Sequence, residues 1–177
     1  MPHAPLRLVL ALVLPAAVAL AGTWNPDRDV GDVVPAWEGL RGTDGRDHGW
    51  DDFAGRDAVV VVFTCNGCPY AVDHEARIDD LATAYDAAGG RVAVVAINSN
   101  QSAEDSLDAM TRRAEERGFD FPYLADPDQR VARSFGALRT PEFFVLDPSR
   151  RIVYMGSLDV DPEGGKPMRR HVEEAVA

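Results

Sequence analysis

The sequence predicts an α/β protein with a mixed central sheet flanked by helices. Two apolar runs rich in β-branched residues, 58–63 (AVVVVF) and 91–97 (RVAVVAI), have the composition of strands buried on both faces, as in parallel sheets. A helical pattern lies between them and completes a βαβ unit. Residues 142–146 and 151–155 are two further apolar runs separated by a turn, which predicts an antiparallel hairpin in the same sheet.

Length and charge limit what such a protein does. The chain has 177 residues, of which 46% are hydrophobic, so it can bury a core as one domain. Its formal net charge is −11 at pH 7, which makes it a poor partner for phosphate backbones. We therefore expect no nucleic-acid binding.

Residues 1–21 have the pattern of a secretory signal peptide. Arg7 precedes the uncharged apolar run 8–20, and Ala19-Leu20-Ala21 places small residues where a signal peptidase reads them. Cleavage after Ala21 predicts an exported protein, either periplasmic, otherwise extracytoplasmic, or secreted. The alternative is an uncleaved anchor, which would be the chain's only membrane contact. The run is short for a membrane span, and Pro15 interrupts it.

The stretch after this segment predicts a linker and then a hairpin. Residues 22–35 are polar and rich in turn formers, so we expect a linker leading into a folded domain at 36–177. Asp44-Gly45, within residues 37–53, predicts a hairpin ahead of the main sheet. A calcium site is an alternative for the acids Asp44, Asp47, Asp51 and Asp52. They lack the alternating spacing of an EF-hand loop, so we expect solvated turn residues.

Helix and turn signals order the rest of the chain. A helix is expected from the cysteine motif to about residue 88, where Gly89-Gly90 ends it. The spacing of Ser102 and Asp105 resembles a capping box and predicts a helix that stops at Gly118. The remaining elements are a short strand at 121–124, a short helix that starts at Asp126-Pro127 and ends at Gly136, and a final helix at 168–177.

The chain has only two cysteines, Cys65 and Cys68, at the junction of the first buried strand and the following helix. A disulfide between them closes too small a loop to stabilise a fold, so the pair indicates chemistry. The amides and dipole at a helix N-terminus favour the thiolate, which is the species that attacks a disulfide. We therefore expect Cys65 to be the nucleophile and Cys68 the resolving thiol. We also expect Cys65 to be the more exposed, with the lower pKa.

Three features together resemble the thioredoxin superfamily: the strand AVVVVF, the motif CNGCP at 65–69 and Thr140-Pro141 before a later strand. The N-terminal hairpin and the helix–strand insertion between 102 and 135 resemble its redoxin branch. That branch includes alkyl-hydroperoxide-reductase/thiol-specific-antioxidant-like proteins and exported TlpA-like reductases. The resemblance covers roughly residues 33–160 and implies a thioredoxin-like fold.

The resemblance also implies roles for Thr140 and Pro141. It implies a cis peptide bond between them, with Pro141 facing the active disulfide and Thr140 offering backbone groups to an extended substrate. The motif departs from thioredoxins, because Thr64 stands where they usually have tryptophan and Asn66-Gly67 lacks proline. Since the residues between the cysteines tune the redox potential, the sequence leaves the direction of electron flow open.

These observations predict an exported thiol–disulfide oxidoreductase that exchanges a Cys65–Cys68 disulfide with protein cysteines. It would need an electron donor or acceptor, which the sequence does not identify, and no cofactor. An antioxidant peroxidase of the peroxiredoxin type is the first alternative, and Arg139 would be its candidate arginine. The peroxidase motif P-x-x-x-T-x-x-C is absent, because Ala58 and Val61 stand where its proline would lie and Thr64 is one position too far from Cys68.

A metal-binding module is the second alternative. Structural zinc requires four ligands, and the chain has two cysteines. Copper delivery by a Sco-like module uses a C-x-x-x-C pair with a distant histidine, for which His171 is the candidate. His48 and His74 are expected to be solvated, although His74 could tune a nearby thiol. The polar residues 98–101 follow a strand end and could border a substrate groove.

Overall fold

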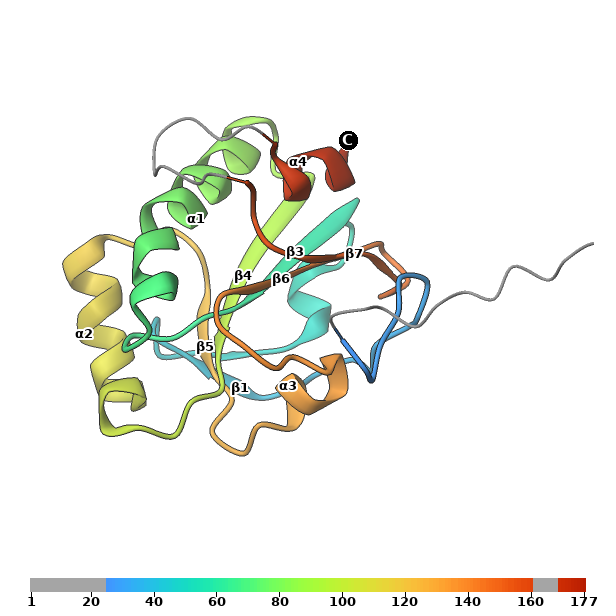
Figure 1. The fold of residues 1–177 in the computed structure, drawn as a ribbon. Coiled ribbons are helices and arrows are strands. Elements are labelled where there is room, and N and C mark those ends of the chain that lie inside the picture. Colours follow the sequence, from blue (N-terminus) through green and yellow to red (C-terminus); the bar gives the residue numbers. More distant parts are fainter. Residues whose placement is uncertain (1–24, 161–168) are drawn as a thin grey trace, which may run out of the picture.

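The computed structural model describes residues 25–160 and 169–177, so the segment 1–21 and residues 22–24 lie outside it. These residues form a seven-stranded mixed sheet with helices on both faces (Figure 1), which confirms the predicted fold class. The strand order is β2-β1-β5-β4-β3-β6-β7. The strands are β1 (Leu40–Gly42), β2 (Asp47–His48), β3 (Ala58–Phe63), β4 (Val92–Asn98), β5 (Tyr123–Ala125), β6 (Glu142–Leu146) and β7 (Ile152–Gly156).

The centre of the sheet is parallel and its margins are antiparallel. β4 pairs in parallel with both β3 and β5, while β6 runs antiparallel to β3 and β7 antiparallel to β6. The predicted N-terminal hairpin is β1–β2, with Gly45 in its turn at φ 78°. The two short strands before β3 therefore occur as the Asp-Gly turn predicts, and the parallel strand β4 occurs as the second apolar run predicts.

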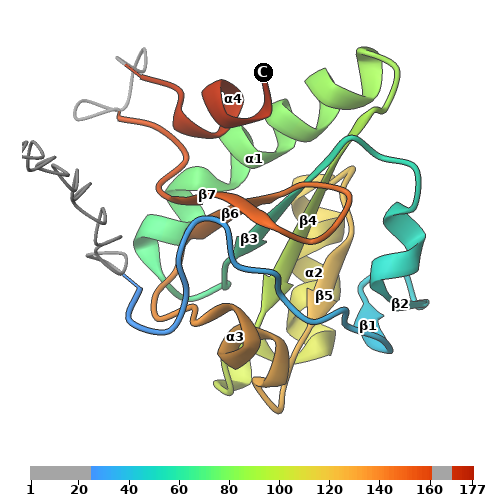
Figure 2. The ribbon, with the colours of Figure 1, turned by 90° about the vertical axis from the view of Figure 1, so that its right-hand side faces the viewer.

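The helices divide between the two faces of the sheet. They are α1 (Pro69–Ala87), α2 (Leu107–Arg117), α3 (Arg130–Phe135) and α4 (His171–Val176), with 3-10 turns η1 (Trp50–Phe53) and η2 (Ala103–Asp105). Figures 1 and 2 show α1 and α2 on one face and α3 with the N-terminal segment on the other. Glu75 on α1 accepts two hydrogen bonds from Arg113 on α2, at 2.8 and 2.9 Å, and this partly buried ion pair connects the two helices.

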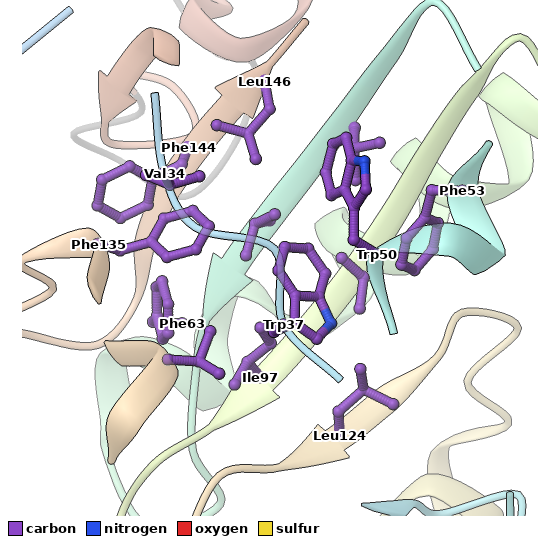
Figure 3. Close-up of a cluster of buried hydrophobic side chains, with 14 of the residues drawn as sticks. Val34, Trp37, Trp50, Phe53, Phe63, Ile97, Leu124, Phe135, Phe144 and Leu146 are labelled. Atoms are coloured by element: carbon purple, nitrogen blue, oxygen red, sulfur yellow. The ribbon is translucent and has the colours of Figure 1, made fainter. Parts of the chain in front are cut away.

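The core has two parts because the side chains of β3 alternate between the faces. Val59, Val61 and Phe63 pack into the cluster that Figure 3 shows, while Val60 and Val62 pack beneath α1, α2 and α4. In the first cluster Trp37 lies edge-on to Trp50 at 5.4 Å between ring centroids. All six residues of β3 are buried, as expected for a central strand. The rigid end of β3 fixes where the cysteine motif begins.

Two predicted helix starts are wrong. Ser102 precedes the 3-10 turn η2, and α2 begins only at Leu107, because the extended backbone of Ser106 separates the turn from the helix. The helix predicted to start at Asp126-Pro127 begins at Arg130. Asp126 nevertheless stabilises the start of α3, since its carboxylate accepts hydrogen bonds from the backbone amides of Val131 and Ala132. The predicted ends of α1, α2 and α3 at glycines are confirmed.

Residues 25–34, which the sequence suggests as a linker, lie against the domain. The Asn25 side chain is 2% exposed and donates a hydrogen bond to the Phe135 carbonyl oxygen. The amide of Gly31 donates to Ile152, and the amide of Ile152 donates to Asp32, so this segment pairs with the start of β7. Within residues 25–160 and 169–177, no helix combines the length and apolar character of a membrane span.

Candidate functional site

The two cysteines and the Thr140–Pro141 pair meet at one end of the sheet. Cys65 lies in the loop after β3, and Cys68 is the N-cap residue of α1. The Cys65 sulfur is 3.2 Å from the Thr140 hydroxyl, and the Cys68 thiol donates to the Thr140 carbonyl oxygen at 3.4 Å. Both cysteines are free thiols, and the predicted cis bond between Thr140 and Pro141 is confirmed. Residues 75 positions apart in the chain thus form one site.

The predicted exposure of the cysteines is wrong. Cys65 is 2% exposed, whereas Cys68 is only partly buried. The prediction assumed that the helix includes Cys68 in its first turn and leaves Cys65 at its tip. Instead Pro69 is the first helical residue, so Cys68 stands at the helix end and Cys65 lies beneath the loop.

The expected order of thiol pKa values is also reversed. Burial raises the pKa of the Cys65 thiol; the Thr140 hydroxyl opposes this effect and the nearby Asp105 carboxylate adds to it. Burial also opposes ionisation of Cys68, but the backbone amides of Ala71 and Tyr70 and the Thr140 hydroxyl outweigh it and lower the pKa of that thiol. The position at the N-terminus of α1 accounts for the difference, because the amides there favour an anion.

Asp105 anchors the motif loop, residues 65–68, through a hydrogen bond. Its Oδ1 accepts the Asn66 backbone amide at 2.7 Å and the Asn98 side-chain amide at 2.9 Å. Its Oδ2 accepts the Ser102 hydroxyl at 2.7 Å and the Asn100 amide at 3.2 Å. Burial disfavours its charge, but these four donors lower the pKa of Asp105 below its ordinary value. The carboxylate is therefore charged at neutral pH although it is 5% exposed.

The η2 turn packs directly on the two residues between the cysteines. The Asn66 side chain donates to the Glu104 carbonyl oxygen at 2.7 Å and accepts a hydrogen bond from Tyr123 at 3.0 Å. A β-carbon placed on Gly67 would lie 2.1 Å from a carboxylate oxygen of Glu104, so this position has no room for a larger residue. The Asn66-Gly67 pair therefore packs against η2, the 3-10 turn that follows β4.

Sequence reasoning missed Asp105 and Tyr123 as site residues. Asp105 was expected only to cap a helix, and Tyr123 only to belong to a short strand. The one available signal was the polar stretch 98–101, and its first residue, Asn98, does join this network by donating to Tyr123 at 3.0 Å. The other contacts depend on the path of the chain after β4, which local patterns do not reveal.

The surface around the cysteines combines a cavity and two exposed apolar side chains. A cavity of about 330 Å³ is lined by Thr140, Arg139 and Phe63 together with residues from the 98–101 loop and α3. Tyr70 is 76% exposed just after the motif, and Leu138 is 60% exposed two residues before Thr140. The buried Glu142 carboxylate accepts the Leu138 amide at 2.9 Å, which holds the 138–141 loop in place.

The other candidate residues lie away from this site. His48 is buried between two carboxylates, with Nε2 3.0 Å from Asp44 and Nδ1 3.3 Å from Asp52, so it is not the solvated residue that the sequence suggests. His171 stacks on Tyr154 at the start of α4. Within the described part of the chain, no three His, Cys, Asp or Glu side chains gather where they could hold a metal ion.

Comparison with known proteins shows to which family this chain belongs. A family model described as Redoxin matches residues 29–175. An uncharacterized conserved protein from Geobacillus kaustophilus is 37% identical, with 79% of this chain and 75% of that chain covered and a TM-score of 0.72.

Two more distant structures share the fold. Peroxidoxin BcpB from Mycobacterium tuberculosis is 24% identical, with 83% of this chain and 93% of that chain covered and a TM-score of 0.63. The thioredoxin domain of a thiol-disulfide oxidoreductase from Bacteroides vulgatus is 23% identical, with 73% and 89% covered and a TM-score of 0.58. No curated protein matches the chain.

Proposed function

The chain belongs to the Redoxin family, in the redoxin branch of the thioredoxin superfamily, and from this premise we propose that it is a thiol–disulfide oxidoreductase. The observation that carries the proposal is the convergence of two free thiols, Cys65 and Cys68, on one residue, Thr140. Metal binding would need further ligands at this place. A dithiol pair at a helix N-terminus instead has what disulfide exchange requires.

The reaction moves two electrons between the cysteine pair and a substrate. When the pair is reduced, one thiolate attacks a substrate disulfide, a mixed disulfide forms and one substrate thiolate leaves. The second thiol then loses its proton, attacks the mixed disulfide and releases the other substrate thiol. The products are the Cys65–Cys68 disulfide and a reduced substrate, and a separate dithiol must return the electrons. The same steps in reverse oxidise a dithiol substrate.

Protein cysteines in extended segments are the substrates that the surface suits best. Thr140, in cis linkage with Pro141, lies beside both sulfurs, and Tyr70 and Leu138 expose apolar side chains two residues from Cys68 and from Thr140. An unfolded or extended polypeptide offers both backbone groups and apolar side chains to such a surface. We also propose export, which the apolar run 8–20 after Arg7 supports.

Equilibration with glutathione redox buffers tests the proposed function. Alkylation of the quenched samples and mass measurement should show one transition between a dithiol and a Cys65–Cys68 disulfide. The reduced protein should then reduce insulin disulfides, and the double variant Cys65→Ser/Cys68→Ser should not. A pair that stays reduced in excess oxidised glutathione, or a double variant as active as the wild type, would refute the proposal.

A further inference from the structure

We propose that the cavity beside Thr140 is a carboxylate-binding subsite, which selects substrate disulfides that carry an acidic group near the reacting cysteine. The inference rests on the proposed function and names the class of substrate on which that function acts. Three features support it: the position of the cavity, the charge of its lining, and the contrast between that charge and the charge of the whole chain.

The cavity adjoins the cysteine pair through Thr140. This residue lines the cavity, its hydroxyl lies 3.2 Å from the Cys65 sulfur, and its carbonyl oxygen accepts a hydrogen bond from the Cys68 thiol. A volume of about 330 Å³ is large enough for one amino-acid side chain. An extended substrate advances about 3.3 Å per residue, so a side chain one or two positions from the reacting cysteine is within reach of the cavity.

The charged groups that line the cavity are positive. Arg133 on α3 and Arg139 in the loop before Thr140 both line it, and both side chains are exposed. Among the described residues, the lining includes no Asp or Glu. A guanidinium presents its N–H donors in a planar fork that matches the two oxygens of a carboxylate. An acidic group is therefore the ligand that this lining suits best.

Arg133 is not neutralised by an acid of its own chain. In the part of the chain that the structure describes, its guanidinium donates to the backbone carbonyl oxygen of Asp128 and forms no ion pair with a carboxylate. Arg130, on the same helix, instead pairs with the Asp128 carboxylate at 3.6 Å. Since a guanidinium has five N–H donors, Arg133 retains donors and its full charge for a bound carboxylate.

Hydrogen bonds connect the walls of the cavity. The Gln129 side chain donates to the Ser99 carbonyl oxygen at 3.0 Å, and the Ser99 hydroxyl donates to the buried Asp126 carboxylate at 2.8 Å. These bonds join the loop after β4 to the start of α3. The cavity is therefore formed before a substrate arrives, which reduces the entropy that binding would cost.

The charge of the whole chain gives the proposal a distinctive consequence. A formal net charge of −11 repels acidic substrates at long range, so net charge alone predicts faster reaction with basic ones. Two arginines reverse this preference only for a carboxylate that enters the cavity, where the separation is small and screening by salt is weaker. The two predictions have opposite signs, so one comparison of substrates distinguishes them.

Peptides with a neutral leaving group supply this comparison. The peptides acetyl-X-Gly-Cys-Gly-X-amide carry 2-thiopyridine in disulfide linkage to the cysteine, with glutamate, glutamine or lysine at both X positions. Either chain direction then brings one X toward the cavity. Reduced protein is mixed with each peptide in stopped flow at pH 7, and release of 2-thiopyridone gives the rate constant. We expect the glutamate peptide to react about tenfold faster than the glutamine peptide, and the lysine peptide to react most slowly. The difference should shrink in about 0.5 M sodium chloride.

A second pair of substrates identifies the source of the carboxylate. The 2-thiopyridine disulfides of glutathione and of its dimethyl ester differ only in their free carboxylates. Faster reaction of glutathione than of the ester would show that a small disulfide supplies the acidic group. A preference confined to the peptides would assign the group to an acidic side chain of a polypeptide. Either result supports the subsite, because the chemistry that it recognises is the same.

Substitutions in the cavity locate the preference. Arg133→Gln/Arg139→Gln removes the two charges, and Arg130→Gln is the matched control, because Arg130 lies on the same helix but does not line the cavity. The double variant should bring the ratio of glutamate to glutamine rates within about twofold, and the control should keep the ratio of the wild type. A ratio that survives the double substitution would overturn the proposal.

The wild-type series alone is decisive if the double variant does not fold. Equal rates with the glutamate and glutamine peptides, or fastest reaction with the lysine peptide, would refute the subsite. If no peptide reacts faster with the reduced wild type than with Cys65→Ser/Cys68→Ser, the proposed function itself fails. If all peptides react at one fast rate, the function stands and only the subsite is refuted.

Discussion

Replacement of Asp105 by asparagine is the sharpest test of how the buried network controls the cysteines. The substitution keeps the shape and removes the charge. The new carboxamide oxygen can still accept the two donors that meet Oδ1, from Asn66 and Asn98. Its NH₂ group would face the Asn100 amide, which cannot accept a hydrogen bond, and the Ser102 hydroxyl, which can turn to do so.

The structure sets the size of the expected changes. Loss of a charged acceptor with one donor left unmatched is expected to lower the free energy of unfolding by about 1–3 kcal/mol. Removal of the negative charge should lower the pKa of Cys65, since Asp105 contributes to raising it. A fall of one pKa unit would increase the Cys65 thiolate fraction about tenfold at a pH below its midpoint.

The assay is the pH dependence of iodoacetamide alkylation at Cys65, measured in the Cys68→Ser background with and without Asp105→Asn. Asp126→Asn is the matched control, because Asp126 is also buried and accepts the Ser99 hydroxyl and two α3 amides rather than donors of the motif loop. We expect both substitutions to reduce stability and only Asp105→Asn to shift the alkylation midpoint to lower pH. Equal midpoints in all three proteins would show that Asp105 acts on the fold alone.

Asp105 also predicts an acid-dependent loss of stability. Its pKa is lowered in the folded state, so its contribution is fully present above the ordinary value of 3.8 and is lost as the pH falls below that value. We therefore expect the difference in unfolding free energy between the wild type and Asp105→Asn, measured by chemical denaturation, to be smaller at pH 3 than at pH 6. A gap that is the same at both pH values would contradict this assignment of charge.

Three further outcomes are expected. Thr140→Val removes the hydroxyl that lowers the pKa of both thiols. Disulfide exchange at pH 7 should therefore slow several-fold, while the melting temperature stays within a few degrees. An unchanged exchange rate would show that the hydroxyl does not assist ionisation of the thiols. Hydrogen peroxide consumption with a thiol donor should stay far below that of a true peroxiredoxin, because the threonine register of the peroxidase motif is missing. N-terminal sequencing of protein secreted by a host cell should begin at Gly22, and a mature chain that retains residues 8–20 would contradict signal-peptide cleavage.

The sequence predicted the parts of the fold that depend on local patterns. The apolar run 58–63 corresponds to β3 residue for residue, and Gly89-Gly90 marks the end of α1 because glycine adopts the positive φ found there. The placement of Thr140 beside the cysteines and its cis bond to Pro141 also agree with the structure, since both followed from a family resemblance that covers roughly residues 33–160.

What the sequence did not predict depends on contacts between distant segments. The burial of Cys65 follows from hydrogen bonds between Asn66 and residues 104–105, almost 40 positions later in the chain. The same region holds the misplaced start of α2, where Asp105 bonds to Asn66 and Asn98 and the helix begins only after the extended Ser106. A spacing such as Ser102 to Asp105 is compatible with a capping box and with this network, and only the tertiary structure distinguishes them.

The segment 31–34 protects the sheet from intermolecular strand addition. β7 is the last strand on its side, and a free edge strand offers unpaired amides and carbonyls to a neighbouring chain. Here Gly31, Asp32 and Val34 form backbone hydrogen bonds with residues 150–152, so the first part of that edge is already occupied. On the opposite edge β2 has only two residues, with Arg41 and Asp47 paired across β1 and β2. Within residues 25–160 and 169–177, neither margin is a long, bare template for amyloid-like association, which would suit the proposed exchange with unfolded, cysteine-bearing chains.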